Sequence, residues 1–445
     1  MALTGLEIYK LLPKKNCGEC GPPTCLAFAM SLAAGKESLE KCPYVSEQAK
    51  EALGSASAPP IKLVKIGAGE KVVELGDETV LFRHDKTFYH PTGIAFEVAD
   101  NLSDAEIDAK IAELNSLSFD RVGLHYDVDM VAVKQTGDAQ RFAQVVQKVV
   151  AGCKLALVLL SEDVAAMTAA LEVANGKNPL IYAATEQNYE AMTELAKKHN
   201  APLAVKSENL SKLAELVEKI TALGHKDLVL DSGNRETAQV LADLTQMRRA
   251  AIKKKFRPFG YPTIAFTTAE NELEEAVQAQ VYISKYASMV VIKSTAKGVV
   301  LPLLTWRQNL YTDPQKPIQV ESRIYEIGNV TEDSPVYLTT NFSLTYFSVE
   351  GEVEGSKVPS YIIPIDTDGT SVLTAWAAGK FTAEKIAEVI NSIGIADKVK
   401  HREVILPGYV AVLSGKLEEK SGWKVIVGPR EAAGIPAFAK SRYGA

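Results

Sequence analysis

The sequence predicts an α/β protein with a (β/α)8 barrel at its centre, a cysteine-rich segment before the barrel and a smaller doubly wound α/β domain after it. Three observations predict this organisation. Apolar strand-like runs alternate with amphipathic helical patterns from residue 93 to residue 293. Four of the five cysteines fall within the first 42 residues. Beyond Leu310 the polar, proline-bearing stretch YTDPQKPIQVE interrupts the alternation, and new strand signals begin at Val336.

A chain of 445 residues is long enough for two or three domains, each with its own core. The run GSASAPP, Gly54–Pro60, has the small and flexible composition of a linker between domains. We therefore expect a cysteine-rich domain over residues 1–57, a barrel with short preceding strands over 58–320 and an α/β domain over 321–445.

The central region predicts eight strands, each followed by a helix. Short strand-like pieces precede them at Ile61–Ile66, Lys71–Leu75 and Val80–Arg83. The eight expected strands are Gly93–Val98, Val122–His125, Leu155–Leu160, Leu180–Ala184, Leu203–Lys206, Leu228–Asp231, Thr263–Thr267 and Met289–Lys293. The expected helices include Ala105–Leu117, Ala139–Val150, Ala165–Asn175, Tyr189–His199, Leu210–Leu223, Thr237–Lys253 and Glu272–Tyr286. This repeat is typical of a (β/α)8 barrel, and an open doubly wound sheet is the alternative.

Composition and charge narrow the range of partners. The formal net charge of −6 and the isoelectric point near 5.7 give no general attraction for polyanions, so nucleic acid and anionic membranes are not expected partners. The N-terminal sequence MALTGLEIYK lacks the pattern of a secretory signal, and no run approaches the length of a membrane span. We expect a cytoplasmic protein.

The cysteines Cys17, Cys20, Cys25 and Cys42 follow the spacing C-x2-C-x4-C-x16-C-P. A short C-x2-C step combined with a remote Cys-Pro is typical of ferredoxin-type iron–sulfur sites, so we expect a [4Fe-4S] cluster on these four thiolates. Zinc, which usually takes two C-x2-C knuckles, and four unrelated buried cysteines are the alternatives. Cys153 stands alone and is interpreted as a core residue. No Gly-x-Gly-x-x-Gly loop or Walker loop is present to suggest a nucleotide site.

The C-terminal region predicts a small sheet flanked by helices. Its expected strands are 336–340, 343–349, 361–366, a short run near residue 404, 410–413 and 423–428, and its expected helices are Ser371–Ala378 and Ala383–Ile393. In such sheets ligands bind outside the carboxyl ends of the strands. The turn after residue 366 carries Gly369, Thr370, Ser371 and Thr374, which could face a ligand; simple helix capping by Thr370 or Ser371 is the other interpretation.

Taken together, the N-terminal NCGECGPPTC…CP motif, the barrel and the C-terminal DGTSVLTAW segment resemble the large (gamma) subunit of the corrinoid/iron–sulfur protein of the anaerobic acetyl-CoA (Wood-Ljungdahl) pathway. The resemblance covers essentially the full chain. It implies a methyl carrier within a corrinoid-dependent methyltransferase system rather than a self-sufficient enzyme. The cobalt of a cobamide, as Co(I), would accept a methyl group from methyltetrahydrofolate on a separate methyltransferase and deliver it to acetyl-CoA synthase, while the cluster would reactivate Co(II).

The resemblance also implies partners and contacts. The partners are a small subunit in a heterodimer, the methyltransferase, and acetyl-CoA synthase/CO dehydrogenase. Carried over to this sequence, Cys17, Cys20, Cys25 and Cys42 ligate the cluster. The corrinoid contacts are expected at Thr340, Tyr346, Gly369, Thr370, Ser371, Val372, Leu373, Thr374, Gly428, Ala433 and Gly434.

Residues 321–445 contain one histidine, His401, outside the D-x-H-x-x-G pattern that supplies a lower cobalt ligand in many corrinoid modules. The absence of a strong lower donor would make Co(I) easier to reach. Polar strand ends in the barrel, including Ser161–Asp163, Lys206–Asn209 and Asp231–Asn234, are interpreted as helix caps. Two other functions stay open at this point: an electron-transfer or scaffold subunit that binds no corrinoid, and a barrel enzyme acting on a pterin.

Overall fold

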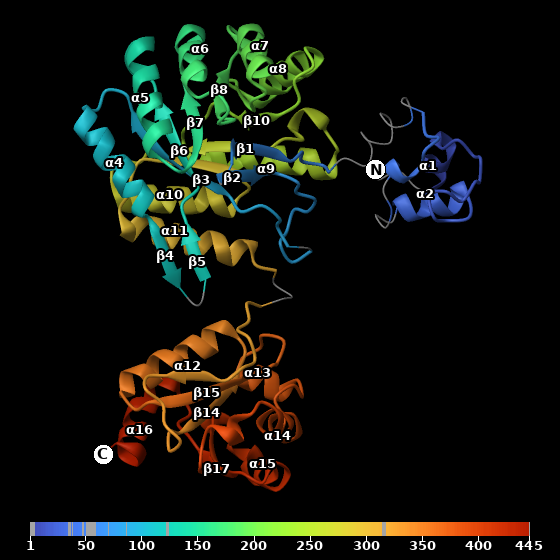
Figure 1. Cartoon of the computed structure of the whole chain (residues 1–445). Coiled ribbons are helices and arrows are strands. Elements are labelled where there is room, and N and C mark those ends of the chain that lie inside the picture. Colours follow the sequence, from blue (N-terminus) through green and yellow to red (C-terminus); the bar gives the residue numbers. More distant parts are fainter. Residues whose placement is uncertain are drawn as a thin grey trace. The chain divides into compact units, whose positions relative to one another are not determined.

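The computed structural model of the chain describes residues 5–33, 37, 39–46, 49, 59–69, 71–85, 87–121, 124–313 and 317–444. The chain divides into two compact units, Met1–Leu117 with Val128–Tyr311 and Ser118–Asp127 with Thr312–Ala445 (Figure 1). No helix in the described residues is long and apolar enough to cross a membrane. The expected linker lies outside the described residues apart from its last two prolines. The division into three domains, with boundaries after residues 57 and 320, stays a prediction.

The N-terminal segment contains α1 (Gly5–Leu11), α2 (Cys25–Ala33) and the 3-10 turn η1 (Leu39–Lys41). Its small core combines apolar side chains with cysteines. The core residues are Ile8, Leu12, Cys20, Cys25, Phe28, Ala29, Cys42, Val45 and Ala49.

The central region is a barrel of eight parallel strands. The strands are β3 (Gly93–Ala99), β6 (Met130–Lys134), β7 (Ala156–Leu160), β8 (Leu180–Ala184), β9 (Leu203–Lys206), β10 (Leu228–Asp231), β11 (Ile264–Phe266) and β12 (Met289–Ile292). They pair in the order β10-β9-β8-β7-β6-β3-β12-β11, and a parallel bridge from Leu230 to Thr263 joins the two ends. The predicted barrel is confirmed, and this bridge rules out the open sheet.

One helix follows each strand and lies on the outside of the barrel (Figure 1). The helices are α4 (Asp104–Ser116), α5 (Ala139–Gly152), α6 (Val164–Val173), α7 (Tyr189–His199), α8 (Leu210–Ala222), α9 (Thr237–Lys253, followed by the 3-10 turn η2, Arg257–Phe259), α10 (Glu272–Ser284) and α11 (Lys297–Tyr311). Every strand except the short β11 is almost wholly buried, as expected for parallel strands covered on both faces.

One predicted barrel strand is wrong. The first two residues of the expected strand Val122–His125 lie outside the described residues, and the other two belong to β5 (Leu124–Asp127), which pairs antiparallel with β4 (Ser118–Arg121) in a separate hairpin. The two ring nitrogens of His125 on β5 lie 2.7 Å from the Asp120 carboxylate and 3.2 Å from the Asp127 carboxylate. A segment this rich in exposed charge cannot line a packed barrel. The true second strand is β6, where four consecutive residues are fully buried.

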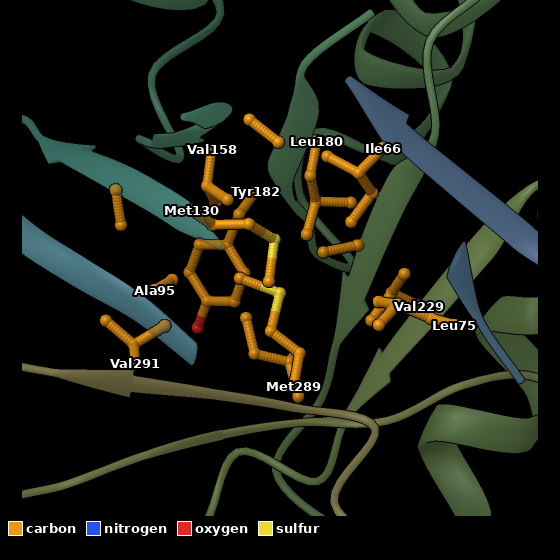
Figure 2. Packing of buried hydrophobic residues seen from close by; sticks show 14 of the residues in the cluster. Ile66, Leu75, Ala95, Met130, Val158, Leu180, Tyr182, Val229, Met289 and Val291 are labelled. Atoms are coloured by element: carbon orange, nitrogen blue, oxygen red, sulfur yellow. The ribbon is translucent and has the colours of Figure 1, made fainter. Parts of the chain in front are cut away.

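A β-hairpin closes the N-terminal end of the barrel. It consists of β1 (Val64–Ala68) and β2 (Lys71–Leu75), and its Gly67 donates to the carbonyl of Asn178, just before β8. Ile66 and Leu75 pack into the barrel core, whose middle is filled by Met130, Met289 and Tyr182 (Figure 2). The expected strand Lys71–Leu75 is confirmed, and the expected strand Ile61–Ile66 overlaps β1 only from Val64. The third expected piece, Val80–Arg83, forms turns instead of a strand.

The second unit contains a five-stranded sheet. Its strands are β13 (Tyr325–Ile327), β14 (Val336–Thr340), β15 (Ser360–Ile365), β16 (Glu403–Leu406) and β17 (Lys424–Val427), in the order β13-β15-β14-β16-β17. All neighbours are parallel except β13, which is antiparallel to β15. The chain leaves β14 toward β15 on one side and returns to β16 on the other, so the β14/β16 boundary is the topological switch point.

The helices of this unit are α12 (Ser343–Ser356), α13 (Val372–Ala377), α14 (Ala383–Ser392), α15 (Ser414–Ser421) and α16 (Ile435–Tyr443), with 3-10 turns at Ile395–Asp397, Gly408–Leu413 and Ala432–Gly434. Two expected strands are wrong. Residues 343–349 begin α12, because Ser343, Tyr346 and Val353 recur at helical spacing on one buried face. Residues 410–413 belong to a 3-10 turn in which Val410 is the buried residue.

A buried ion pair fixes the segment between the hairpin and β3. Arg248 on α9 lies 2.9 Å from Glu78, both side chains are about 5% exposed, and Glu78 also accepts from the backbone N–H of Tyr89 at 3.0 Å. We expect Glu78→Gln to lower the free energy of unfolding of the barrel by about 3 kcal/mol, because it leaves the Arg248 charge buried without its counter-ion. Urea denaturation followed by circular dichroism measures this change.

The matched control breaks an exposed pair. Asp108→Asn removes the carboxylate that lies 2.8 Å from Lys148 on the barrel surface and should cost less than about 1 kcal/mol. Equal losses in the two variants would contradict a special role for the buried pair.

Candidate functional site

The four N-terminal cysteines lie on a short loop and at the ends of the elements around it. Cys17 and Cys20 are in the loop between α1 and α2, Cys25 is the first residue of α2, and Cys42 follows η1. All four are free thiols; Cys17 is exposed and the other three are buried. The loop is tied to α2 by Asn16, whose Oδ1 accepts from the N–H of Cys25 at 2.8 Å.

The glycines after Cys17 and Cys20 allow the loop to turn. Gly18 has φ +77° and Gly21 has φ +103°, backbone conformations that side chains disfavour. Burial, and then the charges of the other three cysteines, raise the pKa of the Cys20 thiol. Three buried thiolates beside an exposed fourth need a positive centre to offset their repulsion, and this donor set fits an iron–sulfur cluster.

Among the described residues, no three His, Cys, Asp or Glu side chains are grouped closely enough to hold a single metal ion. This spacing does not conflict with a cluster. In a cubane cluster each cysteine binds a different iron, so the body of the cluster separates the sulfurs.

In the second unit a cavity of about 300 Å³ opens at the carboxyl ends of β14, β16 and β17. It lies at the switch point of the sheet, where ligands of doubly wound proteins bind. Its wall is largely apolar with a few polar groups. The lining residues are Tyr337, Leu338, Thr339, Thr345, Ser348, Val349, Ser371, Val372, Leu373, Ile405, Leu406, Pro407, Tyr409, Gly428, Pro429, Arg430, Glu431, Ala432 and Ile435.

Three buried hydroxyl groups on β14 have no hydrogen-bond partner in the part of the chain that the structure describes. They belong to Tyr337, Thr339 and Thr340, and the first two residues line the cavity. Burial raises the pKa of Tyr337 well above its ordinary value, so this hydroxyl stays protonated and can donate. Buried hydroxyls without partners cost free energy, and their position at the switch point fits a ligand that supplies the missing hydrogen bonds.

Some of the expected corrinoid contacts line the cavity and others do not. Ser371, Val372, Leu373 and Gly428 line the cavity. Thr374 lies beside it, with its Oγ1 3.1 Å from Ser371 Oγ.

The remaining expected contacts are not among the lining residues. Gly369 and Thr370 form the preceding turn, in which Thr370 donates to the carbonyl of Thr367 at 2.7 Å. Tyr346 is buried and its hydroxyl lies 2.8 Å from Glu350. Ala433 and Gly434 follow lining residue Ala432 in the chain.

The capping interpretation of the turn is wrong. Ser371 occupies the position before α13 but makes no side-chain capping bond, and Thr370 bonds back into the turn. Four other lining residues, which the sequence did not indicate, are Tyr337, Thr339, Tyr409 and Arg430. The position of Thr339 near the end of a strand could have indicated it, whereas the others depend on how separate loops meet.

Both ring nitrogens of His401 are occupied within the chain. Nε2 lies 2.8 Å from the carbonyl oxygen of Ser334, and Nδ1 accepts from the N–H of Glu403 at 3.2 Å. These bonds hold the ring against the sheet.

Several polar strand ends of the barrel make structural bonds, whereas the buried Ser207 Oγ at the end of β9 has no hydrogen-bond partner among the described residues. Asp163 accepts from the N–H of Ala166 at 2.7 Å and Asn209 from that of Lys212 at 3.0 Å, so both are helix caps as predicted. Asp231 is almost fully buried and binds Arg235 at 2.8 Å and the Tyr182 hydroxyl at 2.6 Å. These bonds fill the carboxyl ends of β8 and β10. The interpretation of Asp231–Asn234 as a helix cap is wrong, because Glu236 caps α9.

Comparisons with known proteins show which family this chain resembles. The family model described as "CO dehydrogenase/acetyl-CoA synthase delta subunit" matches residues 63–439, and a model described as "Putative Fe-S cluster" matches residues 12–44. Among solved structures, the dihydropteroate synthase of Yersinia pestis superimposes with a TM-score of 0.37 and 15% identity over 49% of this chain and 93% of that chain.

The curated relatives match over nearly the whole length. The corrinoid/iron–sulfur protein large subunit of Moorella thermoacetica is 61% identical over 99% of both chains. The acetyl-CoA decarbonylase/synthase complex subunit gamma of Methanopyrus kandleri is 36% identical over 98% of this chain and 97% of the relative. The chain thus belongs to the family of corrinoid/iron–sulfur protein large subunits of the acetyl-CoA pathway.

Proposed function

We propose that the chain is a methyl carrier that holds a cobamide in the cavity at the ends of β14, β16 and β17. Bound there, the cobamide would supply a cobalt, as Co(I), that accepts a methyl group from methyltetrahydrofolate on a separate methyltransferase and passes it to acetyl-CoA synthase. The observation that carries this proposal is the set of buried, unpartnered hydroxyls at the switch point. A corrin ring is edged with amide side chains, which can bond to such hydroxyls.

The cavity wall has the chemistry that a corrin needs. The Leu373 side chain and the Tyr409 ring line it, each about 45% exposed, and the lining residues Tyr337 and Thr339 carry buried hydroxyls. His401 is held away from any metal by its own hydrogen bonds. The cobalt would thus lack a protein imidazole below it, which favours the reduced state that methyl transfer requires.

To the N-terminal segment we assign reductive repair of cobalt that has become oxidised. Cys17, Cys20, Cys25 and Cys42 would hold a [4Fe-4S] cluster, whose chemistry is one-electron transfer. We further propose a smaller subunit, a methyltransferase and acetyl-CoA synthase/CO dehydrogenase as partners, in the cytoplasm. The names of the relatives support the first and last of these partners.

The two other candidate functions have weaker support. An electron-transfer or scaffold subunit would have no use for unpartnered hydroxyls in a cavity. A barrel enzyme would need polar groups free at the carboxyl ends of the strands, but Asp163, Asn209 and Asp231 are all engaged in structural bonds.

Two variants, Thr339→Val and Tyr337→Phe, test whether the cavity binds the cobamide. Each should weaken cobamide retention about tenfold, because each removes a hydrogen bond to the ligand worth about 1.4 kcal/mol. Neither should destabilise the cobamide-free protein, because the deleted hydroxyl has no partner there. Cobalt content after dialysis and thermal melting of the cobamide-free chain give the two readouts.

Thr193→Val is the matched control. Thr193 Oγ1 is also buried without a partner, but it lies on α7 of the barrel. This variant should leave cobamide retention unchanged. Unchanged retention in all three variants would refute a corrinoid site at this cavity.

The second prediction tests the cluster through Cys20→Ala. The variant should lose cluster iron and with it reductive reactivation, while methyl transfer from cobalt already reduced to Co(I) continues at nearly the normal rate. Iron analysis and separate assays of reactivation and methyl transfer measure these effects. Cys153→Ala, which removes the half-buried thiol before β7, is the control and should keep both activities. Parallel loss of both activities in Cys20→Ala would refute separate roles.

A further inference from the structure

Arg430 is the one basic residue among the described residues that line the cavity of the second unit. It lies in the loop between β17 and α16, and it is exposed. No hydrogen bond or ion pair joins its guanidinium to another group in the part of the chain that the structure describes. Guanidinium groups pair best with carboxylates and phosphates, so this one is available to an anionic group of a ligand in the cavity.

Close packing of two loops fixes the backbone that carries Arg430. Gly408, after β16, donates its N–H to the carbonyl of Pro429 at 2.9 Å. A Cβ atom on Gly408 would lie 2.6 Å from the carbonyl oxygen of Gly428 and 2.8 Å from the carbonyl carbon of Pro429. Both distances are too short for a side chain, so glycine at this position lets the two loops meet. When a ligand binds, only the side chain of Arg430 has to become ordered.

The one acidic residue in the described part of the cavity wall is bonded to a tyrosine. This residue is Glu431, which follows Arg430 in the chain, and its carboxylate accepts from the hydroxyl of Tyr409. The carboxylate therefore has a partner other than the guanidinium. Helix α16 begins at Ile435 without a side-chain cap, so the positive end of its dipole adds to the positive potential of the loop.

A cobamide offers one anionic group to such a loop. The corrin ring is edged with neutral amides, and the lower base is attached through a nucleotide loop that contains a phosphodiester. Arginine binds phosphate through two parallel N–H···O bonds, a geometry that the single oxygen of an amide does not match. The buried hydroxyls of Tyr337 and Thr339 suit the amides instead, so different residues of the wall fit the two kinds of group.

We propose that Arg430 binds the phosphodiester of the cobamide and thereby selects complete cobamides over corrinoids that lack the nucleotide loop. This inference rests on the corrinoid site proposed above. It makes Arg430 a specificity-determining residue, whereas the hydroxyls on β14 serve any corrinoid. Hydrogen bonds to a charged group of this kind change affinity by about tenfold to hundredfold.

The experiment measures the equilibrium affinity of the cobamide-free, full-length chain for three corrinoids by visible absorption. Cobalamin has the whole nucleotide loop, cobinamide phosphate keeps a phosphate without the base, and cobinamide has neither. The unaltered chain should bind the first two about tenfold to hundredfold more tightly than cobinamide. Arg430→Gln should bind all three with nearly the affinity for cobinamide. Its melting temperature should stay the same, because Arg430 is exposed.

Two further arginine variants complete the test. Arg430→Lys keeps the charge but not the paired N–H groups, so it should restore part of the preference for the phosphate-bearing corrinoids. Arg442→Gln is the matched control, because Arg442 is an exposed arginine on α16 that is not among the lining residues. This variant should keep the full preference.

The outcomes separate this inference from the proposed function. Equal affinity of the unaltered chain for cobalamin and cobinamide would refute the role of Arg430 while leaving the corrinoid site intact. An equal loss of affinity for both corrinoids in Arg430→Gln would do the same. A preference for cobalamin that cobinamide phosphate does not share would assign the selection to the lower base and overturn the inference. A chain that binds no corrinoid would refute the site itself and the role of Arg430 with it.

Discussion

A parallel sheet must be covered on both faces, because its strands can be connected only by crossovers that lay helices over it. Here the sheet meets this constraint by closing on itself through the Leu230–Thr263 bridge. Closure leaves two open ends. The β1–β2 hairpin covers the N-terminal end, and Tyr182, Asp231 and Arg235 occupy the carboxyl ends of β8 and β10 on the other side.

The closed barrel and the open sheet differ in the space that they leave at the carboxyl ends of their strands. In most barrel enzymes the carboxyl ends of the strands carry the active site. In this chain several of those positions carry helix caps, and Arg235 pairs there with the buried Asp231. The second unit differs because its open sheet has a switch point, and there the loops diverge and leave a cavity. The same α/β construction therefore gives a filled core in one unit and an open cavity in the other.

The N-terminal segment depends on a different constraint. A segment of about 40 residues rarely builds a sufficient apolar core by itself. Three of its core residues are cysteines, which pack beside Ile8 and Phe28. A cluster bound to these thiols would add covalent links between α2, the loop and the turn before Cys42, so that ligand binding and folding of the segment would be coupled.

The sequence by itself determined the features that depend on local spacing. The cysteine pattern, the strand–helix repeat from residue 93 to 293 and the helix caps at Asp163 and Asn209 all follow from residues close together in the chain. Tertiary structure decided which apolar run enters the barrel, because Leu124–Asp127 and Met130–Lys134 are both plausible strands and only the second can be buried on both faces. It also decided that residues 343–349 are helical. The unpartnered hydroxyls of Tyr337 and Thr339 became visible only in the fold, because a missing hydrogen bond depends on every group that packs around the site.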